Sequence, residues 1–209
     1  MKYIIILLIS LLPATDLSYI KLVNKSFSNC NQIIENNVFK SCYNYELKSA
    51  TASLIEIKAE QVNTKNIAKR PAFYEDKSIP ELYRTKSEDW TNTEHDRGHI
   101  QSDASNDYTE DVLRLTYAMS NITMQKPITN RKSYLEVEKR ERELAVIHGK
   151  IKALTIINYS QESINTIRVP SEYIKIFFDS SYNTLECYKV KNDNQRYELN
   201  QLKIDCSLL

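Results

Sequence analysis

A histidine and an arginine flank one of only two glycines in the chain, in the segment Asp96-Arg97-Gly98-His99. Average usage of roughly 7% would give about 15 glycines in a chain of this length, so Gly98 marks a backbone position that excludes a side chain. A neutral imidazole takes a proton from water near neutral pH, and a guanidinium neutralises negative charge. The segment therefore predicts a general base beside an anion-binding group. The alternative is that His99 is structural and hydrogen-bonded at the end of a strand.

A second set of polar residues recurs every four positions in a segment that predicts a helix over residues 130–148. Pro127 lies just upstream, Thr129 or Asn130 can cap the start, and Gly149 follows the end. Steps of four residues advance about 400°, so the set forms one slowly drifting stripe that can face a solvated site. Its members are Asn130, Tyr134, Glu138 and Arg142. The sequence predicts that the apolar residues of the same helix pack elsewhere, namely Leu135, Val137, Leu144 and Ile147.

Together with the segment 120–125 (Ser-Asn-Ile-Thr-Met-Gln), these two motifs resemble the DNA/RNA non-specific endonucleases of the ββα-metal, or His-Me finger, class. The pattern of that family is Asp-Arg-Gly-His, then Ser-Asn-x-x-Pro-Gln, then an Asn with an aromatic residue four positions on and a Glu eight positions on. The segment 70–74 (Arg-Pro-Ala-Phe-Tyr) resembles the part where the family places a catalytic arginine. The departures are Ser102 and Met124 in place of Pro, Tyr134 in place of Trp, and His95 where an aromatic residue is common.

The resemblance implies hydrolysis of phosphodiester bonds in DNA and RNA, leaving 5′-phosphate ends. His99 would be the general base, and Asn130 would bind Mg²⁺ through its amide oxygen, with Mn²⁺ as an alternative ion. Asn130 is also well suited to be a helix cap. Glu138 would hold water molecules bound to the metal; the alternative is an ion pair with Arg142 one helical turn away.

Further residues would support the same chemistry. Arg70 and Arg97 would neutralise the charge that develops on the phosphate, although Lys69 and Arg84 are rivals for the place of Arg70. Asn121 would orient the site by hydrogen bonds. Asp96 and Arg142 would not contact substrate or metal themselves but would support the residues that do. A catalytically inactive relative that binds nucleic acid without cutting it is the alternative function.

The overall charge places limits on how substrate could be bound. The net charge is only +1, which excludes a globally basic nucleic-acid-binding protein. Six basic residues nevertheless gather between positions 65 and 86 and could line a groove along a phosphate backbone; acidic residues interspersed among them make a solvated loop the alternative. The six are Lys65, Lys69, Arg70, Lys77, Arg84 and Lys86. No aromatic-rich motif for reading bases is visible, so sequence-specific cutting is not predicted.

The fold class predicted for residues 19–209 is α+β, as one nuclease domain with a mixed or antiparallel sheet and an embedded ββα-metal element. The chain has 209 residues, 42% hydrophobic and 26% charged, which is ordinary globular usage. Strands are expected within 43–57 and at 151–157, 173–178, 185–190 and 202–206, with a long polar excursion over 58–95. Residues 112–122 are expected to form a strand, or a helix followed by a strand.

The N-terminus and the cysteines indicate export. Residues 1–18 have a basic start, a short apolar run and small residues, which is typical of a signal peptide with an uncertain cleavage point. We therefore expect a secreted or periplasmic protein that has no membrane segment after cleavage; the oligomeric state stays open. An even cysteine count favours two disulfides, and local pairing, Cys30 with Cys42 and Cys187 with Cys206, is the simplest arrangement.

Overall fold

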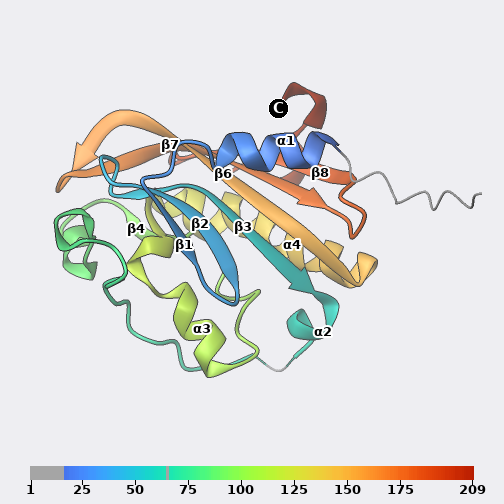
Figure 1. Cartoon of the computed structure of the whole chain (residues 1–209), viewed down its shortest axis with the longest axis horizontal. Helices are drawn as coiled ribbons and strands as arrows, with labels where there is room; N and C mark the ends of the chain where they lie inside the picture. The colour runs from blue at the N-terminus through green and yellow to red at the C-terminus, as the bar shows by residue number, and fades with distance from the viewer. Residues whose placement is uncertain (1–16, 65) are drawn as a thin grey trace, which may run out of the picture.

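The computed structural model describes residues 17–64 and 66–209, so almost the whole of the expected signal peptide lies outside the described residues. Within these residues, seven strands form one sheet in which every neighbouring pair is antiparallel, in the order β1-β2-β3-β6-β7-β8-β9 (Figure 1). This confirms the predicted α+β class with an antiparallel sheet. The strands are β1 (Gln32–Glu35), β2 (Phe39–Asn44), β3 (Ser49–Lys58), β6 (Lys150–Ile164), β7 (Ile167–Phe178), β8 (Thr184–Lys191) and β9 (Lys203–Ile204).

Both faces of the sheet are covered, because successive side chains of a strand point to opposite faces. On β7, Ile174 and Ile176 pack towards helix α1 (Leu17–Ser26), while Tyr173 and Phe177 pack towards helix α4 (Tyr134–His148). Figure 1 shows α1 and α4 with the sheet between them. The two hydrophobic layers pack α1 and α4 against opposite faces of the sheet. Helix α4 carries the polar residues that the sequence singled out.

The remaining helices are short: α2 (Ala59–Val62), α3 (Glu110–Thr116) and α5 (Leu199–Leu202), with single 3₁₀ turns at Glu81–Tyr83, Ser87–Trp90, Met119–Asn121 and Cys206–Leu208. The predicted helix-plus-strand over 112–122 corresponds to α3 and the start of β5 (Ile122–Gln125). The expected strand at 202–206 is reduced to β9, which has two residues. None of the helices in the described part is long and apolar enough to cross a membrane.

The segment between β3 and β6 leaves the sheet at the end of β3 and returns to it at the start of β6, next to the point where it left. The backbone nitrogen of Ala59 donates a hydrogen bond to the carbonyl oxygen of Gly149 at 2.8 Å, and β3 pairs directly with β6. The first part, 58–95, is mostly irregular, as predicted. It is not wholly a surface loop, since Ile79 and Trp90 are buried.

The predicted disulfide pairing is confirmed. Cys30 is bonded to Cys42, with Cα atoms 5.0 Å apart, and Cys187 to Cys206, with Cα atoms 5.4 Å apart. The first disulfide joins the segment after α1 to β2, and the second joins the C-terminal turn to β8. Both therefore fasten chain ends to the sheet.

The helical segment that includes α4 confirms the predicted end and corrects two details. It ends at His148, and Gly149 has a φ of 76°, the left-handed conformation expected of a glycine after a helix. It begins at Pro127, three residues before Asn130. The expectation that Ile147 packs was wrong: Ile147 is 64% exposed, because it lies off the buried stripe formed by Tyr134, Val137, Leu144 and Ala145.

Candidate active site

Two short strands followed by a helix form the frame of the candidate site. Strand β4 (Asp96–His99) pairs in antiparallel register with β5 (Ile122–Gln125), and the helical segment starts two residues after β5. Gly98 faces Thr123 across this pair. A Cβ atom at Gly98 would lie 2.2 Å from the side chain of Gln125. Only glycine therefore fits beside Gln125 and allows the two strands to pair.

His99 lies at the end of β4 with its ring held by aromatic packing. Its centroid is 4.8 Å from that of Tyr117, edge-on, and 5.7 Å from that of Phe73. Nε2 is buried and has no hydrogen-bond partner among the residues described. Burial lowers the pKa of His99 to about 4, with Arg70 acting in the same direction and Asp103 opposing. The imidazole is therefore neutral at pH 7, the state that a general base requires.

Arg70 is the upstream arginine that reaches the surroundings of His99. Its guanidinium lies 3.0 Å from Asp107 and 3.4 Å from Asp103, and its side chain is 35% exposed. The rival Arg84 donates instead to the backbone oxygens of Ile79 and Lys77. Arg70 is thus oriented by two carboxylates and keeps an accessible surface.

Arg97 is also held near Phe73. It donates a hydrogen bond to the backbone oxygen of Ser87, and its guanidinium carbon lies 5.9 Å from the centre of the Phe73 ring. Phe73 therefore contacts both Arg97 and His99. The guanidinium is partly buried and fixed by the 3₁₀ turn at 87–90.

Asp96 connects β4 to the start of the helical segment. Its carboxylate accepts a hydrogen bond from Nδ2 of Asn130 at 3.0 Å and two from Arg131, at 2.6 and 2.7 Å. Burial opposes ionisation, but the bonds from Arg131 and Asn130 outweigh it and hold the pKa of Asp96 below its ordinary value. The amide of Asn130 is thereby oriented, and within the described part of the chain its oxygen accepts no hydrogen bond.

Glu138 and Arg142 do not form the ion pair that the sequence offered as an alternative. Within the described ranges no hydrogen bond or ion pair involves Glu138, whereas Arg142 lies 3.4 and 3.5 Å from the hydroxyls of Ser105 and Ser102. Burial raises the pKa of Glu138 to about 8, with Glu141 acting in the same direction and Lys175 opposing. Glu138 therefore presents a carboxyl group whose oxygens are not used by the protein.

Asn121 is fully buried and serves the backbone around the site. Its oxygen accepts a bond from the nitrogen of Gln101 at 3.0 Å, and its Nδ2 donates to the backbone oxygens of Gln101 and Thr116. Its own carbonyl oxygen accepts from Ile100. These bonds fix the backbone directly after His99.

The polar stripe expected along the helix is interrupted, which corrects the role of one residue. Tyr134 is 1% exposed and donates its hydroxyl to the backbone oxygen of Ile100 at 3.1 Å, so it belongs to the core. The physical reason is a π-helical turn over Thr129–Ser133, which adds residues to the turn and shifts Asn130 around the axis relative to Tyr134. Such turns have no simple signature in a single sequence.

An ion pair that sequence reasoning missed lies behind the site. Lys175 of β7 and Glu141 of α4 are both 0% exposed and are bonded to each other, and Glu141 also accepts from the hydroxyl of Ser105 at 3.0 Å. The signal was present as one lysine inside the apolar run at 173–178. This pair ties the helix to the sheet beneath Glu138.

The basic residues at 65–86 are only partly available to a polyanion. Lys86 pairs with Glu75 at 3.7 Å, and Lys65 lies outside the described residues. Lys69, Arg70 and Arg114 of α3 line a cavity of about 310 Å³ together with the acidic residues Glu110 and Asp111. Of this basic cluster, Arg70 is the residue whose charge acts on His99.

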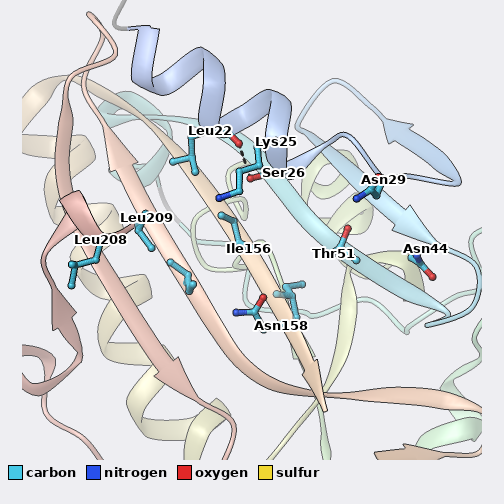
Figure 2. A pocket seen from close by; sticks show the side chains of 12 residues that line it. Leu22, Lys25, Ser26, Asn29, Asn44, Thr51, Ile156, Asn158, Leu208 and Leu209 are labelled. Atoms are coloured by element: carbon cyan, nitrogen blue, oxygen red, sulfur yellow. Dashed lines mark hydrogen bonds between the residues drawn. The ribbon is translucent and has the colours of Figure 1, made fainter. Parts of the chain in front are cut away.

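A larger cavity lies on the opposite face of the sheet, away from the candidate site. Figure 2 shows it between α1, the strands and the C-terminal residues, with Lys25 and Ser26 above Ile156 and Asn158. Its volume is about 460 Å³. None of the residues predicted to take part in catalysis lines it, so the cavity and the ββα site are separate features.

The sequence of this chain is similar to those of several curated nucleases. Human mitochondrial endonuclease G is 21% identical over 149 residues, which are 65% of this chain and 50% of that protein, and the bovine protein gives the same values. A mitochondrial nuclease of Saccharomyces cerevisiae is 31% identical over 88 residues, 42% of this chain and 27% of that protein. The chain thus spans half or less of the length of these curated relatives.

A solved structure of an EndoG/EndoGI complex has the same fold. It superposes with a TM-score of 0.75 at 17% identity and covers 89% of this chain and 86% of that one. The family described as DNA/RNA non-specific endonuclease matches residues 19–208. By this match over nearly its whole length, the chain belongs to the DNA/RNA non-specific endonuclease family.

Proposed function

We propose that the chain is an exported endonuclease that hydrolyses phosphodiester bonds of DNA and RNA without sequence preference and depends on Mg²⁺. The observation that carries the proposal is the environment of His99. The ring is neutral because it is buried, Arg70 lies close enough to influence its pKa, and the neighbouring helix presents Asn130 and Glu138 with unused oxygens. His99, Asn130 and Glu138 belong to one strand pair and the helix that follows it, and Arg70 approaches from the upstream excursion, which supports the proposal.

His99 acts as the general base. It removes a proton from a water molecule while the water oxygen forms a bond to phosphorus and the bond from phosphorus to the 3′ oxygen breaks. The leaving oxygen takes a proton from solvent, and the products carry 5′-phosphate and 3′-hydroxyl ends. Arg70 and Arg97 neutralise negative charge added to the phosphate oxygens during attack. Packing against Tyr117 and Phe73 keeps the imidazole in place.

The residues present fit a magnesium ion held by few protein ligands. Mg²⁺ retains several water molecules and accepts amide, carboxylate and phosphate oxygens. The free oxygen of Asn130 would bind it directly, and Glu138 would accept hydrogen bonds from its water molecules. In the described ranges no three His, Cys, Asp or Glu side chains cluster as a metal site. When bound, the ion polarises the phosphate and stabilises the leaving oxygen. Mn²⁺ is the first alternative to test.

A digestion assay tests the proposal. Supercoiled plasmid and a structureless RNA are incubated with the wild-type protein, with Mg²⁺, with Mn²⁺, or with EDTA. We expect cleavage of both substrates that EDTA abolishes, and a loss of about 10²- to 10⁴-fold in rate for His99→Ala. His148→Ala, at the exposed end of α4, is the matched control and should retain activity. Binding of nucleic acid without cleavage would instead assign the chain to the inactive relatives.

Location and domain limits are part of the same proposal. Two disulfides favour an oxidising compartment. We infer that residues 1–18 direct export and that residues 19–209 form one nuclease domain that acts outside the cytoplasm. Mass spectrometry of the N-terminus of the mature protein tests the first point, and activity of a chain that begins at residue 19 tests the second.

A further inference from the structure

A polar cavity of about 410 Å³ lies beside β4 and β5, separate from the surroundings of His99. It is formed by the loop that enters β4, by Lys126 directly after β5, and by the end of β6 with the turn that follows it. Its lining includes Thr91, Thr93 and Glu162. The cavity is thus lined by the residue before Asp96 and the residue after Gln125. Asp96 and Gln125 are paired across β4 and β5, the strand pair that carries the candidate site.

His95 is the unusual member of this lining. It is only 7% exposed, yet neither ring nitrogen has a hydrogen-bond partner among the described residues. A buried polar group without a partner costs free energy, so such a group commonly serves a ligand. Burial, with the charge of Lys126, lowers the pKa of His95, so its neutral ring offers one N–H donor.

Lys126 is the cation of the cavity. It is partly buried, and in the part of the chain that the structure describes its ammonium group forms no ion pair. Glu94 and Glu162 also line the cavity, but both are exposed, so solvent and salt screen their charges. Lys126, which is partly buried, and His95, with its unpartnered N–H, are therefore the groups best placed to hold an anion there.

The cavity adjoins the proposed metal ligand. The backbone nitrogen of Asn130 donates to the carbonyl oxygen of Lys126 at 2.9 Å, and the side chain of Asn130 bonds to Asp96, the residue after His95. Asn130 therefore lies one helical turn after Lys126 and is bonded to the neighbour of His95, two residues that line the cavity. This adjacency favours a neighbouring part of the substrate, rather than an unrelated ligand, as the occupant.

We propose that this cavity binds a phosphate of the substrate strand that neighbours the scissile phosphate, through Lys126 and His95. The inference rests on the proposed nuclease function. A base is the poorer occupant, because single-stranded nucleic acids stack bases on aromatic side chains and no Phe, Tyr or Trp lines this cavity in the described structure. The subsite favours substrates with more than one phosphate and adds no preference for sequence.

The test compares a dinucleotide with one phosphodiester, TpT, and the oligonucleotide dT10 as substrates. Lys126→Gln should leave kcat/KM on TpT unchanged and raise KM on dT10, while kcat on dT10 stays the same. The slope of log(kcat/KM) against log salt on dT10 should fall by about 0.7, the value for one phosphate contact on a single strand. Lys21→Gln, on the exposed side of α1, removes the same charge on the opposite face of the sheet and should change neither value.

Two further variants separate charge and hydrogen bonding from folding. Lys126→Arg keeps the charge and should restore the wild-type salt slope. His95→Phe keeps a planar ring without an N–H and should raise KM on dT10 only.

The subsite would be overturned if Lys126→Gln and Lys21→Gln had the same KM and the same salt slope on dT10. It would also be overturned if Lys126→Gln lost kcat/KM equally on TpT and on dT10. Absence of any cleavage by the wild-type protein would instead overturn the nuclease function. Displacement of dT10 by millimolar inorganic phosphate in the wild type but not in Lys126→Gln would support the subsite independently.

Discussion

The amide nitrogen of Asn130 donates a hydrogen bond of 3.0 Å to the carboxylate of Asp96, across the junction between β4 and the start of the helical segment. The bond fixes which end of the amide faces away from the strand. Since nitrogen is the end that is bonded, oxygen is the end that remains for the proposed Mg²⁺. An asparagine without this partner would present either end and would bind a hard cation less firmly.

The first prediction follows from this bond. Asp96→Ala should raise the Mg²⁺ concentration for half-maximal activity by about 10- to 100-fold, the usual effect of losing a residue that orients a metal ligand. Arg131→Ala removes the other partner of Asp96 but keeps its bond to Asn130, so its shift should be smaller. Titration of activity with Mg²⁺ gives both values. An unchanged Mg²⁺ requirement in Asp96→Ala would show that Asn130 does not need this orientation.

The second prediction concerns the pH profile. Because burial lowers the pKa of His99 to about 4, the neutral base persists well below pH 6.5. The acid limb of kcat/KM, which reports the free enzyme, should therefore have its midpoint close to pH 4. Initial rates on dT10 between pH 3.5 and 8 measure it, with a control for unfolding at each pH. A midpoint at about 6.5 would indicate a solvated imidazole.

The third prediction uses the carboxyl of Glu138, whose pKa is raised to about 8 by burial. A carboxyl with a raised pKa favours the folded state when protonated, and this contribution is lost as pH rises from about 4.5 through 8. Glu138→Gln imitates the protonated form. In EDTA it should match the wild type at pH 4 and exceed it by roughly 1 to 3 kcal/mol at pH 8.5.

Denaturant unfolding at the two pH values measures this difference. Glu143→Gln, an exposed position on the same helix, is the control and should show little difference at either pH. Activity in Mg²⁺ should fall in Glu138→Gln although its stability rises. A variant that is less stable than the wild type at pH 8.5 would contradict the assignment of a destabilised carboxylate.

The fourth prediction concerns the buried pair of Lys175 and Glu141. Lys175→Met leaves the charge of Glu141 without a partner at 0% exposure and should cost about 3 to 5 kcal/mol. The double variant Lys175→Met with Glu141→Leu removes both charges and should recover most of that loss. Thermal unfolding of the three proteins is the measurement. Equal instability of the single and double variants would show that packing, and not charge, is what the pair provides.

The parts of the fold that were predictable have strong local signals. Runs such as Tyr173–Phe178 are apolar enough to be strands, and the position of Gly149 marks the end of the helix because few other residues adopt its φ. Strand β4 has no alternation to reveal it. It pairs with β5 only because Gly98 admits the side chain of Gln125, which is a contact between residues far apart in sequence.

The candidate site was likewise only partly predictable from the sequence. The spacing of Asn130 and Glu138 placed both on one helix, but the π-helical turn that rotates Asn130 away from Tyr134 depends on packing and could not be read from the spacing. The orientation of Arg70 depends on Asp103 and Asp107, more than 30 residues away. Pairs of this kind are decided by tertiary contacts, so the sequence predicted the residue types and left their partners open.

Residues 59–149 form one loop between two adjacent strands, and this affects which insertions and deletions the chain can tolerate. All of the proposed catalytic residues lie in this one loop, whose ends meet where Ala59 bonds to Gly149. The entropy of closing a loop grows only with the logarithm of its length, so doubling the loop costs about 0.6 kcal/mol. Lengthening or shortening its irregular parts therefore changes the closing entropy little, and the sheet tolerates such changes as long as α4 still covers its face.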